Sequence, residues 1–440
     1  MEGWRGSAVE FGYNFLYNRA VEKIRVHGHH DLRLKGEVRI SGAKNSVLPA
    51  IAAGLLTSEE IRLRNVPRVK DVHTMLTLVD GLGGKSSLED HTISLRVERI
   101  TSDEASYELV RAMRASVLVL GPLLARSGRA AVALPGGCAI GSRPVDLHMS
   151  GLQKLGARIS LEHGYIRAHA ERLRGAVIEF EKKTVTGTEN LLMAASLAEG
   201  ETILKNCALE PEVADLAVLL TKMGAKINGV GEETVRIKGV KKLHGAEHDI
   251  IPDRIETGTF LVAGALTGGD ILLVDVEPSH VRTLIEKLLA SGAVIEPEGP
   301  RAIRVLGHRG LKAQDVTTSP YPGFPTDMQA QFTVLMTQAQ GTSIITETIF
   351  DRRFSHVNEL LRLGAEIEVQ GDKAIVRGKT PLSGAEVTAT DLRASACLVL
   401  AGLVASGVTV LSEIDHLDRG YERIEEKLRG LGASVERFES

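Results

Sequence analysis

Residues 134–148, LPGGCAIGSRPVDLH, contain the side chains best suited to chemistry. Glycines flank Cys138, and Arg143 follows it closely. Glycine lets the backbone adopt positive φ values, and a guanidinium near a thiol favours the thiolate. The motif therefore predicts a mobile loop on which Cys138 acts as an acid, a base or a nucleophile. Cys207 and Cys397 lie among apolar residues instead, so we expect them to be buried and inert.

A second motif, GEVRISGAKNSVLPAIAAGLL over residues 36–56, places Lys44 where a strand gives way to a helix. The N-terminus of a helix attracts anions, and Lys44 adds a full positive charge there. An anion site is one interpretation, and a solvated lysine at a helix start is the other. The spacing of a P-loop is absent.

A third motif, SPYPGFPTDMQAQF over residues 319–332, carries a carboxylate at the expected start of a helix. Its prolines stiffen the chain before Asp327. A rigidly held carboxylate could take a proton from a substrate hydroxyl. A simple helix cap is the alternative, and this motif alone favours the cap.

Arginines at equivalent places in repeated segments form a fourth feature: Arg114, Arg353, Arg393 and Arg419. Guanidinium groups bind phosphates and carboxylates through two parallel hydrogen bonds. Each arginine alone is more typical of a surface ion pair. Together with Lys44 and Arg143, they indicate a polyanionic substrate.

The elements that must position these residues recur along the chain. Gly-Ala steps follow one another at intervals of about 70 residues. They occur at Gly156, Gly224, Gly292, Gly364 and Gly432, and a weaker copy ends near Gly83 and Gly84. Each copy predicts the order strand, helix, strand, helix, strand, strand. The first helix is apolar nearly all round and should be buried, whereas the second has one apolar stripe and stops at the glycine.

Six such units favour an α/β (α+β) fold of two domains with three repeats each. We expect residues 21–43 and 252–440 to form the domain with both termini, and residues 44–251 to form the domain with the Cys138 loop. The segment 22–40 resembles the missing end of the sixth unit. Residues 1–20 fit no repeat and are expected to be a disordered extension. A solenoid is disfavoured because its repeats are usually shorter.

The composition narrows the class of protein. A formal net charge of −3 argues against a general nucleic-acid binder. Three cysteines do not make a disulfide framework, the N-terminus lacks a secretory signal, and no apolar run is long enough to span a membrane. We expect a cytoplasmic protein with small-molecule partners and no nucleic-acid or membrane partner. The oligomeric state stays open.

Neither a metal nor a redox cofactor is expected. His27, His29 and His30 could bind a metal, but no second ligand cluster accompanies them, so a solvated turn is favoured. The sequence has no zinc-type pair of cysteines, and no GxGxxG motif follows a predicted strand.

The motifs SGAKN, LPGGCAIGSRPVDLH, IPDRIETGTF, FPTDMQAQF, TDLRAS and DRGYERIEEKLRGLGA resemble those of the UDP-N-acetylglucosamine 1-carboxyvinyltransferase family of enolpyruvyl transferases. The resemblance runs from about Val21 to the C-terminus. It implies a two-domain inside-out α/β barrel. It also implies transfer of the enolpyruvyl group of phosphoenolpyruvate to the 3′-hydroxyl of UDP-N-acetylglucosamine, with release of phosphate and without a cofactor. This reaction is the first committed step of peptidoglycan synthesis.

The resemblance also implies roles for single residues. Cys138 matches the proton donor to the methylene carbon of phosphoenolpyruvate, which also forms a phospholactoyl adduct and is the target of fosfomycin. Asp327 matches the residue that contacts the 3′-hydroxyl and is expected to deprotonate it. The groups that bind phosphoenolpyruvate match Lys44, Arg143 and Arg419, with Asn45 beside them. The contacts to the nucleotide sugar match Arg114, Arg143, Pro144, Val145, Asp146, Leu147, Lys182, Thr184, Val185 and Ile349. Arginines of the closing C-terminal domain match Arg353 and Arg393.

Two departures and three alternatives accompany the resemblance. Tyr321 stands where some family members have histidine, which is expected to alter nucleotide contacts, and the N-terminal extension has no counterpart. The nearest alternative is 3-phosphoshikimate 1-carboxyvinyltransferase, which shares the fold but lacks the Cys138 loop. A thiol hydrolase with His148 as the base and a non-catalytic repeat scaffold are the others.

Overall fold

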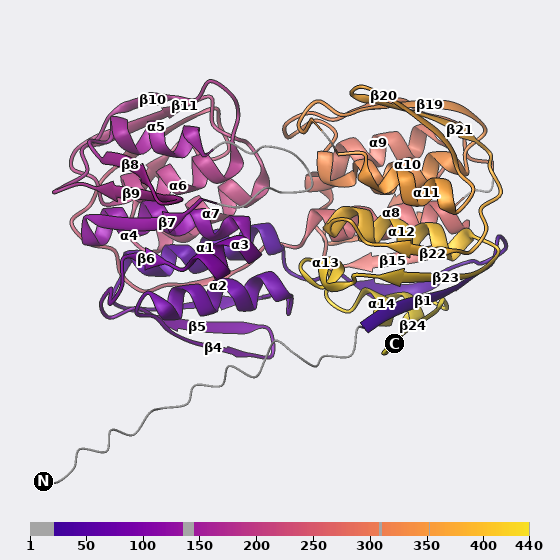
Figure 1. The fold of residues 1–440 in the computed structure, drawn as a ribbon, viewed down its shortest axis with the longest axis horizontal. Coiled ribbons are helices and arrows are strands. Elements are labelled where there is room, and N and C mark those ends of the chain that lie inside the picture. Colours follow the sequence, from indigo (N-terminus) through magenta and orange to yellow (C-terminus); the bar gives the residue numbers. More distant parts are fainter. Residues whose placement is uncertain (1–21, 135–144, 308–309, 352, 440) are drawn as a thin grey trace, which may run out of the picture.

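The computed structural model describes residues 22–134, 145–307, 310–351 and 353–439. Three residues of the predicted site, Cys138, Arg143 and Pro144, therefore lie outside the described residues. Figure 1 shows two lobes side by side, with the described part of the chain beginning and ending in the same lobe.

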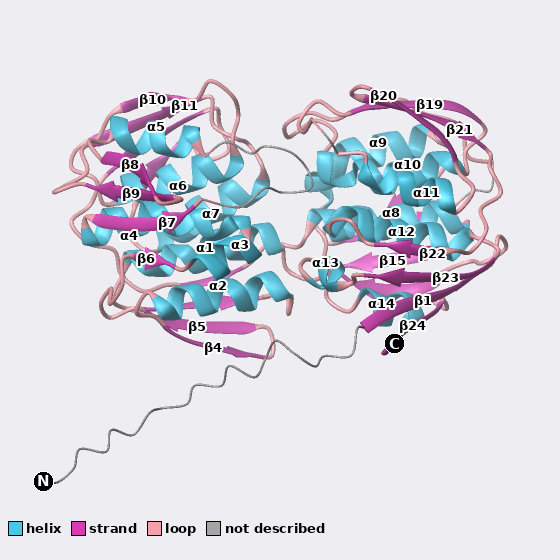
Figure 2. Ribbon diagram, in the orientation of Figure 1, coloured by secondary structure: helices cyan, strands magenta, loops and turns pink. Residues whose placement is uncertain are grey.

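Buried hydrophobic side chains form two separate clusters. One cluster is drawn from residues 43–250, and the other from residues 24–40 and 255–435. Figure 2 shows helices in the middle of each lobe and sheets around them. This is the predicted two-domain α/β fold. From the two clusters we propose the domain boundaries that the sequence suggested, namely 44–251, and 21–43 with 252–440.

The described residues form six four-stranded sheets. In the first lobe the sheets run, in spatial order, β10 (Val177–Glu179), β11 (Glu201–Lys205), β13 (Thr234–Lys238), β12 (Lys226–Asn228); β14 (Glu247–Asp249), β3 (Glu60–Arg64), β5 (Thr92–Arg96), β4 (Lys85–Glu89); and β6 (Glu104–Ala105), β7 (Arg129–Ala133), β9 (Tyr165–His169), β8 (Arg158–Glu162). In the second they run β22 (Glu386–Thr388), β23 (Gly407–Ser412), β1 (Glu22–Gly28), β24 (Ser434–Glu439); β16 (Val294–Pro297), β17 (Ala302–Leu306), β15 (Asp270–Val274), β2 (Lys35–Arg39); and β18 (Val316–Thr317), β19 (Gly341–Thr346), β21 (Lys373–Gly378), β20 (Glu366–Gln370).

Helices connect these strands. Those of the first lobe are α1 (Lys44–Ala53), η1 (Gly54–Leu56), α2 (Lys70–Gly81), α3 (Tyr107–Ala112), η2 (Arg114–Val119), α4 (Leu120–Ser127), α5 (Asp146–Lys154), α6 (Val185–Ser196) and α7 (Pro211–Lys222). Those of the second are α8 (Arg254–Thr267), η3 (Pro278–Val281), α9 (Arg282–Ala290), η4 (Thr326–Met328), α10 (Gln329–Thr337), α11 (Ser355–Arg362), α12 (Leu392–Val404), α13 (Asp415–Asp418) and α14 (Ile424–Gly430).

Every sheet has the same pairing pattern. An edge strand pairs in parallel with its neighbour, as β10 does with β11, and the remaining pairs are antiparallel. A parallel pair needs a crossover connection, which a buried helix supplies. The predicted strand–helix–strand–helix–strand–strand repeat is therefore confirmed, with three repeats in each lobe.

The prediction for the N-terminal segment is only partly correct. As expected, β1 completes the sixth repeat by pairing with β23 and β24. In contrast, β2 pairs in parallel with β15 and belongs to another repeat. Similarly, β14 precedes α8 in the chain, but it pairs with β3 in the first lobe, whereas α8 lies in the second. Each crossing between the lobes thus separates a first strand from the helix that follows it in sequence.

Burial and glycine positions follow the repeat. The first helices, such as α6 and α8, are buried along almost their whole length, as predicted. Burying a leucine or valine side chain contributes roughly 1.5–3 kcal/mol, so these helices supply much of the core stability. Gly224 follows α7 with a φ of 100°, a conformation that favours glycine. No helix among the described residues is long and apolar enough to span a membrane.

The two crossing segments lie side by side. The amide of Ala43 donates to the carbonyl of Ile251 over 2.8 Å, and the amide of Asp253 donates to Ser41 over 2.9 Å. Gly42 lies in this pair, and a Cβ there would be 1.7 Å from the carbonyl oxygen of Asn65. The close approach explains the glycine, and the pairing brings the first residues of α1 and α8 together.

Candidate active site

Lys44 begins α1, immediately after the first crossing segment. Its Nζ is 3.3 Å from Oδ2 of Asp71, which lies in the first turn of α2. Only 11% of the Lys44 side chain and 4% of the Asp71 side chain are exposed. Lys44 is therefore a buried, paired cation, and the interpretation as a solvated helix start is wrong.

Arg419 reaches the same carboxylate from the second lobe. It follows α13, and its Nε is 2.9 Å from Oδ1 of Asp71. The Arg419 side chain is 31% exposed, so it is only partly buried. Asp71 thus receives one cation from each lobe.

Burial has the largest effect on Lys44 and lowers the pKa of its ammonium group. The carboxylate of Asp71 raises this pKa, whereas the positive charges of Arg393 and Arg419 lower it. Because arginine stays protonated throughout the physiological range, Lys44 is the cation of this group that loses its proton first.

Asp327 lies in η4, just before α10, and its carboxylate contacts two arginines. Nη2 of Arg353 is 2.7 Å from Oδ1, and Nη2 of Arg393 is 2.9 Å from Oδ2. The two arginine side chains are 6% and 4% exposed, and that of Asp327 is 24% exposed. The motif alone favoured a helix cap, but the carboxylate instead forms two ion pairs.

Burial acts to raise the pKa of Asp327, but the charges of Arg393 and Arg353 outweigh it and hold the pKa well below its usual range. The carboxylate is therefore ionised at neutral pH. A base with such a low pKa accepts a proton poorly while both guanidinium groups remain in place.

Neighbouring side chains fix the two arginines. Asp391 caps α12 by accepting from the amides of Arg393 and Ala394, which sets the position of Arg393 at the helix start. Arg353 donates to Oγ1 of Thr326 over 2.8 Å, and that hydroxyl donates to Glu347 over 2.8 Å. Glu347 had not been singled out in the sequence.

The Asp71 and Asp327 groups belong to one site. Lys44 interacts electrostatically with Arg393 and Asp327 as well as with Asp71 and Arg419. Its backbone amide also donates to Asp253 over 3.3 Å, and Asp253 caps α8. The site therefore collects cations from α1, α12, the end of α13 and the turn before α11.

The predicted nucleotide-sugar contacts occur mostly at two helix starts. Val145, Asp146 and Leu147 stand at the start of α5, and Thr184 caps α6 by accepting from the amide of Gly187. The helices α5 and α6 pack against each other. Their N-terminal ends favour an anion, as the diphosphate of a nucleotide sugar requires.

The remaining predicted contacts are spread over both lobes. Asn45 is partly exposed beside Lys44, Lys182 is exposed before α6, and Val185 is the first residue of α6. The amide of Ile349 donates to Oε1 of Glu347 over 2.8 Å, which brings Ile349 to the Asp327 group.

His148 is buried and held by hydrogen bonds. Asn190 donates to its Nδ1 over 3.0 Å, so the neutral ring carries its proton on Nε2, 3.2 Å from Oγ1 of Thr186. Burial, followed by the charge of Arg114, lowers its pKa to about 4. This arrangement makes His148 a poor general base and weakens the thiol-hydrolase alternative.

Three carboxylates of the site were not predicted, and the sequence conceals each of them for a different reason. Asp253 stands in the motif IPDRIETGTF, so its motif was noted but not its role. Asp71 gives no signal in the sequence, because an acid in the first turn of an amphipathic helix is common. Glu347 follows β19 without any distinctive neighbour.

Tyr321 lines a cavity of about 400 Å³ together with Arg254, His280 and Arg282. None of the described residues predicted to bind substrate lines this cavity. The amide of Tyr321 donates to Glu210 of the first lobe over 3.3 Å, and Arg254 pairs with Glu212 over 2.9 Å. Tyr321 therefore belongs to a contact between the lobes near the crossing segments.

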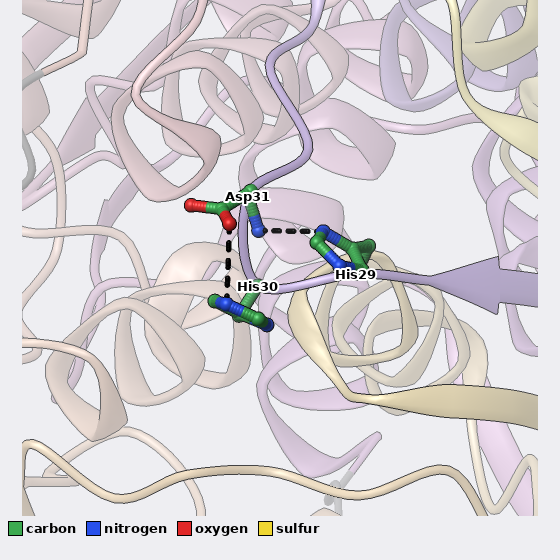
Figure 3. A group of neighbouring side chains, drawn as sticks. All are labelled: His29, His30 and Asp31. Carbon is green, nitrogen blue, oxygen red and sulfur yellow. Dashed lines mark hydrogen bonds and ion pairs between the residues drawn. The ribbon is translucent and has the colours of Figure 1, made fainter.

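Among the described residues, one group of three potential metal ligands comes together: His29, His30 and Asp31 (Figure 3). All three are exposed in the turn after β1. His30 pairs with the Asp31 carboxylate over 3.2 Å, and His29 accepts from the Asp31 amide over 3.1 Å. Because these groups already bond to one another in solvent, we retain the interpretation of a solvated turn.

Cys207 and Cys397 are fully buried, as predicted. Burial raises the pKa of the Cys207 thiol to about 11, and it also raises that of Cys397. Both therefore remain protonated and unreactive at neutral pH.

Comparison with known proteins identifies the family. Residues 29–428 match the family described as EPSP synthase (3-phosphoshikimate 1-carboxyvinyltransferase). The chain belongs to the EPSP synthase family. Within this family, it is 59% identical to a protein of Koribacter versatilis named UDP-N-acetylglucosamine 1-carboxyvinyltransferase, covering 92% of this chain and 94% of the relative. A protein of the same name from Magnetococcus marinus is 57% identical, covering 95% of this chain and 100% of the relative. The resemblance predicted from the motifs is thus confirmed.

Solved structures of the EPSP synthase family share the fold. The enolpyruvyl transferase NikO from Streptomyces tendae matches with a TM-score of 0.85 and 26% identity, covering 96% of this chain and 100% of NikO. An EPSP synthase from Acinetobacter baumannii matches with a TM-score of 0.73 and 20% identity, covering 95% of this chain and 100% of that chain. The second likeness supports the fold alone.

Proposed function

We propose that this chain is a transferase that moves the enolpyruvyl group of phosphoenolpyruvate to the 3′-hydroxyl of UDP-N-acetylglucosamine and releases phosphate. The observation that carries the proposal is a cluster of cations from both lobes, namely the buried Lys44, Arg353 and Arg393 and the partly exposed Arg419. Such a cluster suits a substrate pair that brings a phosphate, a carboxylate and a diphosphate to one place. Relatives at 56–59% identity bear the name of this reaction.

The reaction has two steps in this proposal. The sugar hydroxyl adds to C2 of phosphoenolpyruvate while a proton is added to its methylene carbon C3. The new methyl group then returns a proton to the deprotonated acid as the C2–O bond to phosphate breaks, which restores the double bond. We assign Cys138 as the acid at C3 and Asp327 as the base at the hydroxyl.

The cations stabilise the charge that develops during these steps. We assign Lys44, Arg143 and Arg419 to phosphoenolpyruvate, with Asn45 beside them. Positive groups aimed at a leaving phosphate lower the barrier most when water is excluded. Closure of the two lobes over the substrates would exclude water and bring Arg419 onto the same anion as Lys44.

The ion pairs of Asp327 place a condition on its role as a base. The carboxylate cannot take a proton efficiently while Arg353 and Arg393 both hold it. Substrate anions compete for guanidinium groups through the same bidentate bonds. We therefore propose that binding of the anionic substrates draws at least one arginine away and raises the basicity of Asp327.

We propose that Arg114, Lys182, Thr184, Val185 and Ile349 contact the nucleotide sugar, with the segment from Arg143 to Leu147. The packed N-terminal ends of α5 and α6 support this assignment, since they favour the diphosphate. We further propose that the protein works in the cytoplasm in peptidoglycan synthesis. Roles in cell-wall biogenesis, cell shape and cell division follow from that step.

Phosphate release tests the proposal. We expect release from phosphoenolpyruvate only when UDP-N-acetylglucosamine is present, and no turnover with shikimate 3-phosphate. Turnover with shikimate 3-phosphate instead would favour the 3-phosphoshikimate alternative, which shares the family. Inhibition by fosfomycin and loss of activity in Cys138→Ser are expected as well, and unchanged activity of that variant in every assay would favour a non-catalytic scaffold.

A further inference from the structure

We propose that Asp71 is a positioning residue for enolpyruvyl transfer, which holds Lys44 and Arg419 side by side so that both face one substrate anion. The inference rests on the proposed function. It starts from the two ion pairs that converge on one carboxylate, at 3.3 Å from Lys44 and 2.9 Å from Arg419.

The carboxylate is arranged to bind two cations at once. Arg419 donates to Oδ1 through Nε and to Oδ2 through Nη2 over 3.5 Å, and Lys44 shares Oδ2, so both oxygens of the carboxylate are engaged. Asp71 is 4% exposed, and it stands in the first turn of α2, where the helix dipole favours a negative charge. A buried carboxylate held in this way is a fixed point between two long, flexible side chains.

The two cations come from different lobes, so the contact works across the molecule. Lys44 is placed by α1, whereas Arg419 follows α13 in the second lobe. Arg419 is 348 residues from Asp71 in the sequence, so the pair forms only where the two lobes meet. Asp71 therefore sets the spacing of the cations at the moment the lobes meet.

Asp71 also keeps Lys44 charged. The charged groups around Lys44 are Asp71, Arg393, Arg419 and Asp327, with Asp253 on its backbone amide and Asp215 on the hydroxyl of Ser46 in the same helix. Two of these are arginines that oppose a third positive charge. Removal of the Asp71 charge would lower the pKa of Lys44 further, because the main raising influence would be lost.

The test is the pH profile of kcat/KM for phosphoenolpyruvate in Asp71→Asn. We expect the alkaline limb, where Lys44 loses its proton, to move to lower pH. A shift of one pKa unit lowers the charged fraction about tenfold on that limb, so the loss relative to wild type should be at least about tenfold in alkaline buffer and should shrink towards pH 6. Asp71→Glu restores the charge and should return the limb to the wild-type position.

The matched control is Asp415→Asn. Asp415 pairs with Lys70, the residue next to Asp71, over 2.9 Å and also joins the two lobes, but both side chains are more than half exposed. This variant should leave the profile unchanged. Asp71→Asn with a wild-type limb and a wild-type KM for phosphoenolpyruvate would overturn the proposal.

Two further measurements distinguish a failure of the proposed function from a failure of the proposed role of Asp71. If wild-type protein does not turn over the two substrates, the proposed function fails. The role of Asp71 in positioning the two cations can still be tested in that case. Calorimetry compares the affinity of wild type and of Asp71→Asn for inorganic phosphate across the same pH range, and equal affinities would contradict that role. If Asp71→Asn does not fold, Asp71→Glu is decisive, since a displaced carboxylate should raise KM without moving the limb, and an unchanged KM would contradict a positioning role.

Discussion

Two carboxylates organise the site, and they differ in where their cations come from. Asp327 takes both guanidinium groups from the second lobe, and these are almost fully buried. Asp71 takes Lys44 from the first lobe and the partly exposed Arg419 from the second. The Asp327 group is therefore built when one lobe folds, whereas the Asp71 group exists only when the lobes meet. The comparison separates a preassembled part of the site from a part that depends on closure.

The largest expected effect comes from breaking the preassembled group at its centre. Asp327→Asn keeps the shape but removes the base, so kcat should fall by about 10²–10⁴-fold, the usual contribution of a general base. Steady-state kinetics with both substrates measures this, with KM for each recorded separately. A kcat within a fewfold of wild type would show that another group deprotonates the hydroxyl.

A pair of arginine variants tests whether the Asp327 group contributes more than the Asp71 group to the unfolding free energy of the protein. Arg393→Ala removes one of the two partners of Asp327, which should cost less than the roughly 3–5 kcal/mol of unfolding free energy lost when a buried charge has no partner left, because Arg353 remains. Arg419→Ala removes a partly exposed partner and should cost less, although KM for phosphoenolpyruvate should rise. Urea unfolding of both variants beside wild type measures the difference. Equal losses of stability would contradict the distinction between the groups.

The pH dependence of stability sharpens the same comparison. The folded-state pKa of Asp327 lies well below that of the unfolded chain, so its ion pairs stabilise the fold above the unfolded value, about 3.9. That contribution is lost as the pH falls through the folded value. The unfolding free energy of wild type should therefore fall more steeply below about pH 4 than that of Asp327→Asn. If the unfolding free energies of the two proteins changed in parallel with pH, Asp327 would not be held by the two arginine ion pairs.

The smallest effect is expected at the exposed contact between the lobes. Lys70→Ala removes a pair with Asp415 whose side chains are 51% and 72% exposed. Exposed ion pairs contribute about 0–1 kcal/mol, so stability and kinetics should stay close to wild type. High salt should reduce the small difference from wild type further, because it screens exposed charges. A loss of activity similar to that expected for Arg419→Ala would mean that any contact between the lobes matters, not the buried one in particular.

Local patterns in the sequence determined much of the fold. The glycine after each amphipathic helix and the small apolar helices before it predicted six repeats in two lobes, because helix burial and helix ends depend on residues close in the chain. The motifs around Lys44 and Asp327 likewise predicted charged groups at helix starts, and both residues lie there.

Only the tertiary structure decided how these groups meet. The exchange of β2 and β14 between repeats depends on where the chain crosses, which no local pattern encodes. Asp71 gave no signal, since its partners are Lys44 from another helix and Arg419 from the other lobe. Whether a lysine is solvated or buried, and whether an aspartate caps a helix or holds arginines, follows from long-range packing, which sets both the local dielectric and the neighbours of each charge.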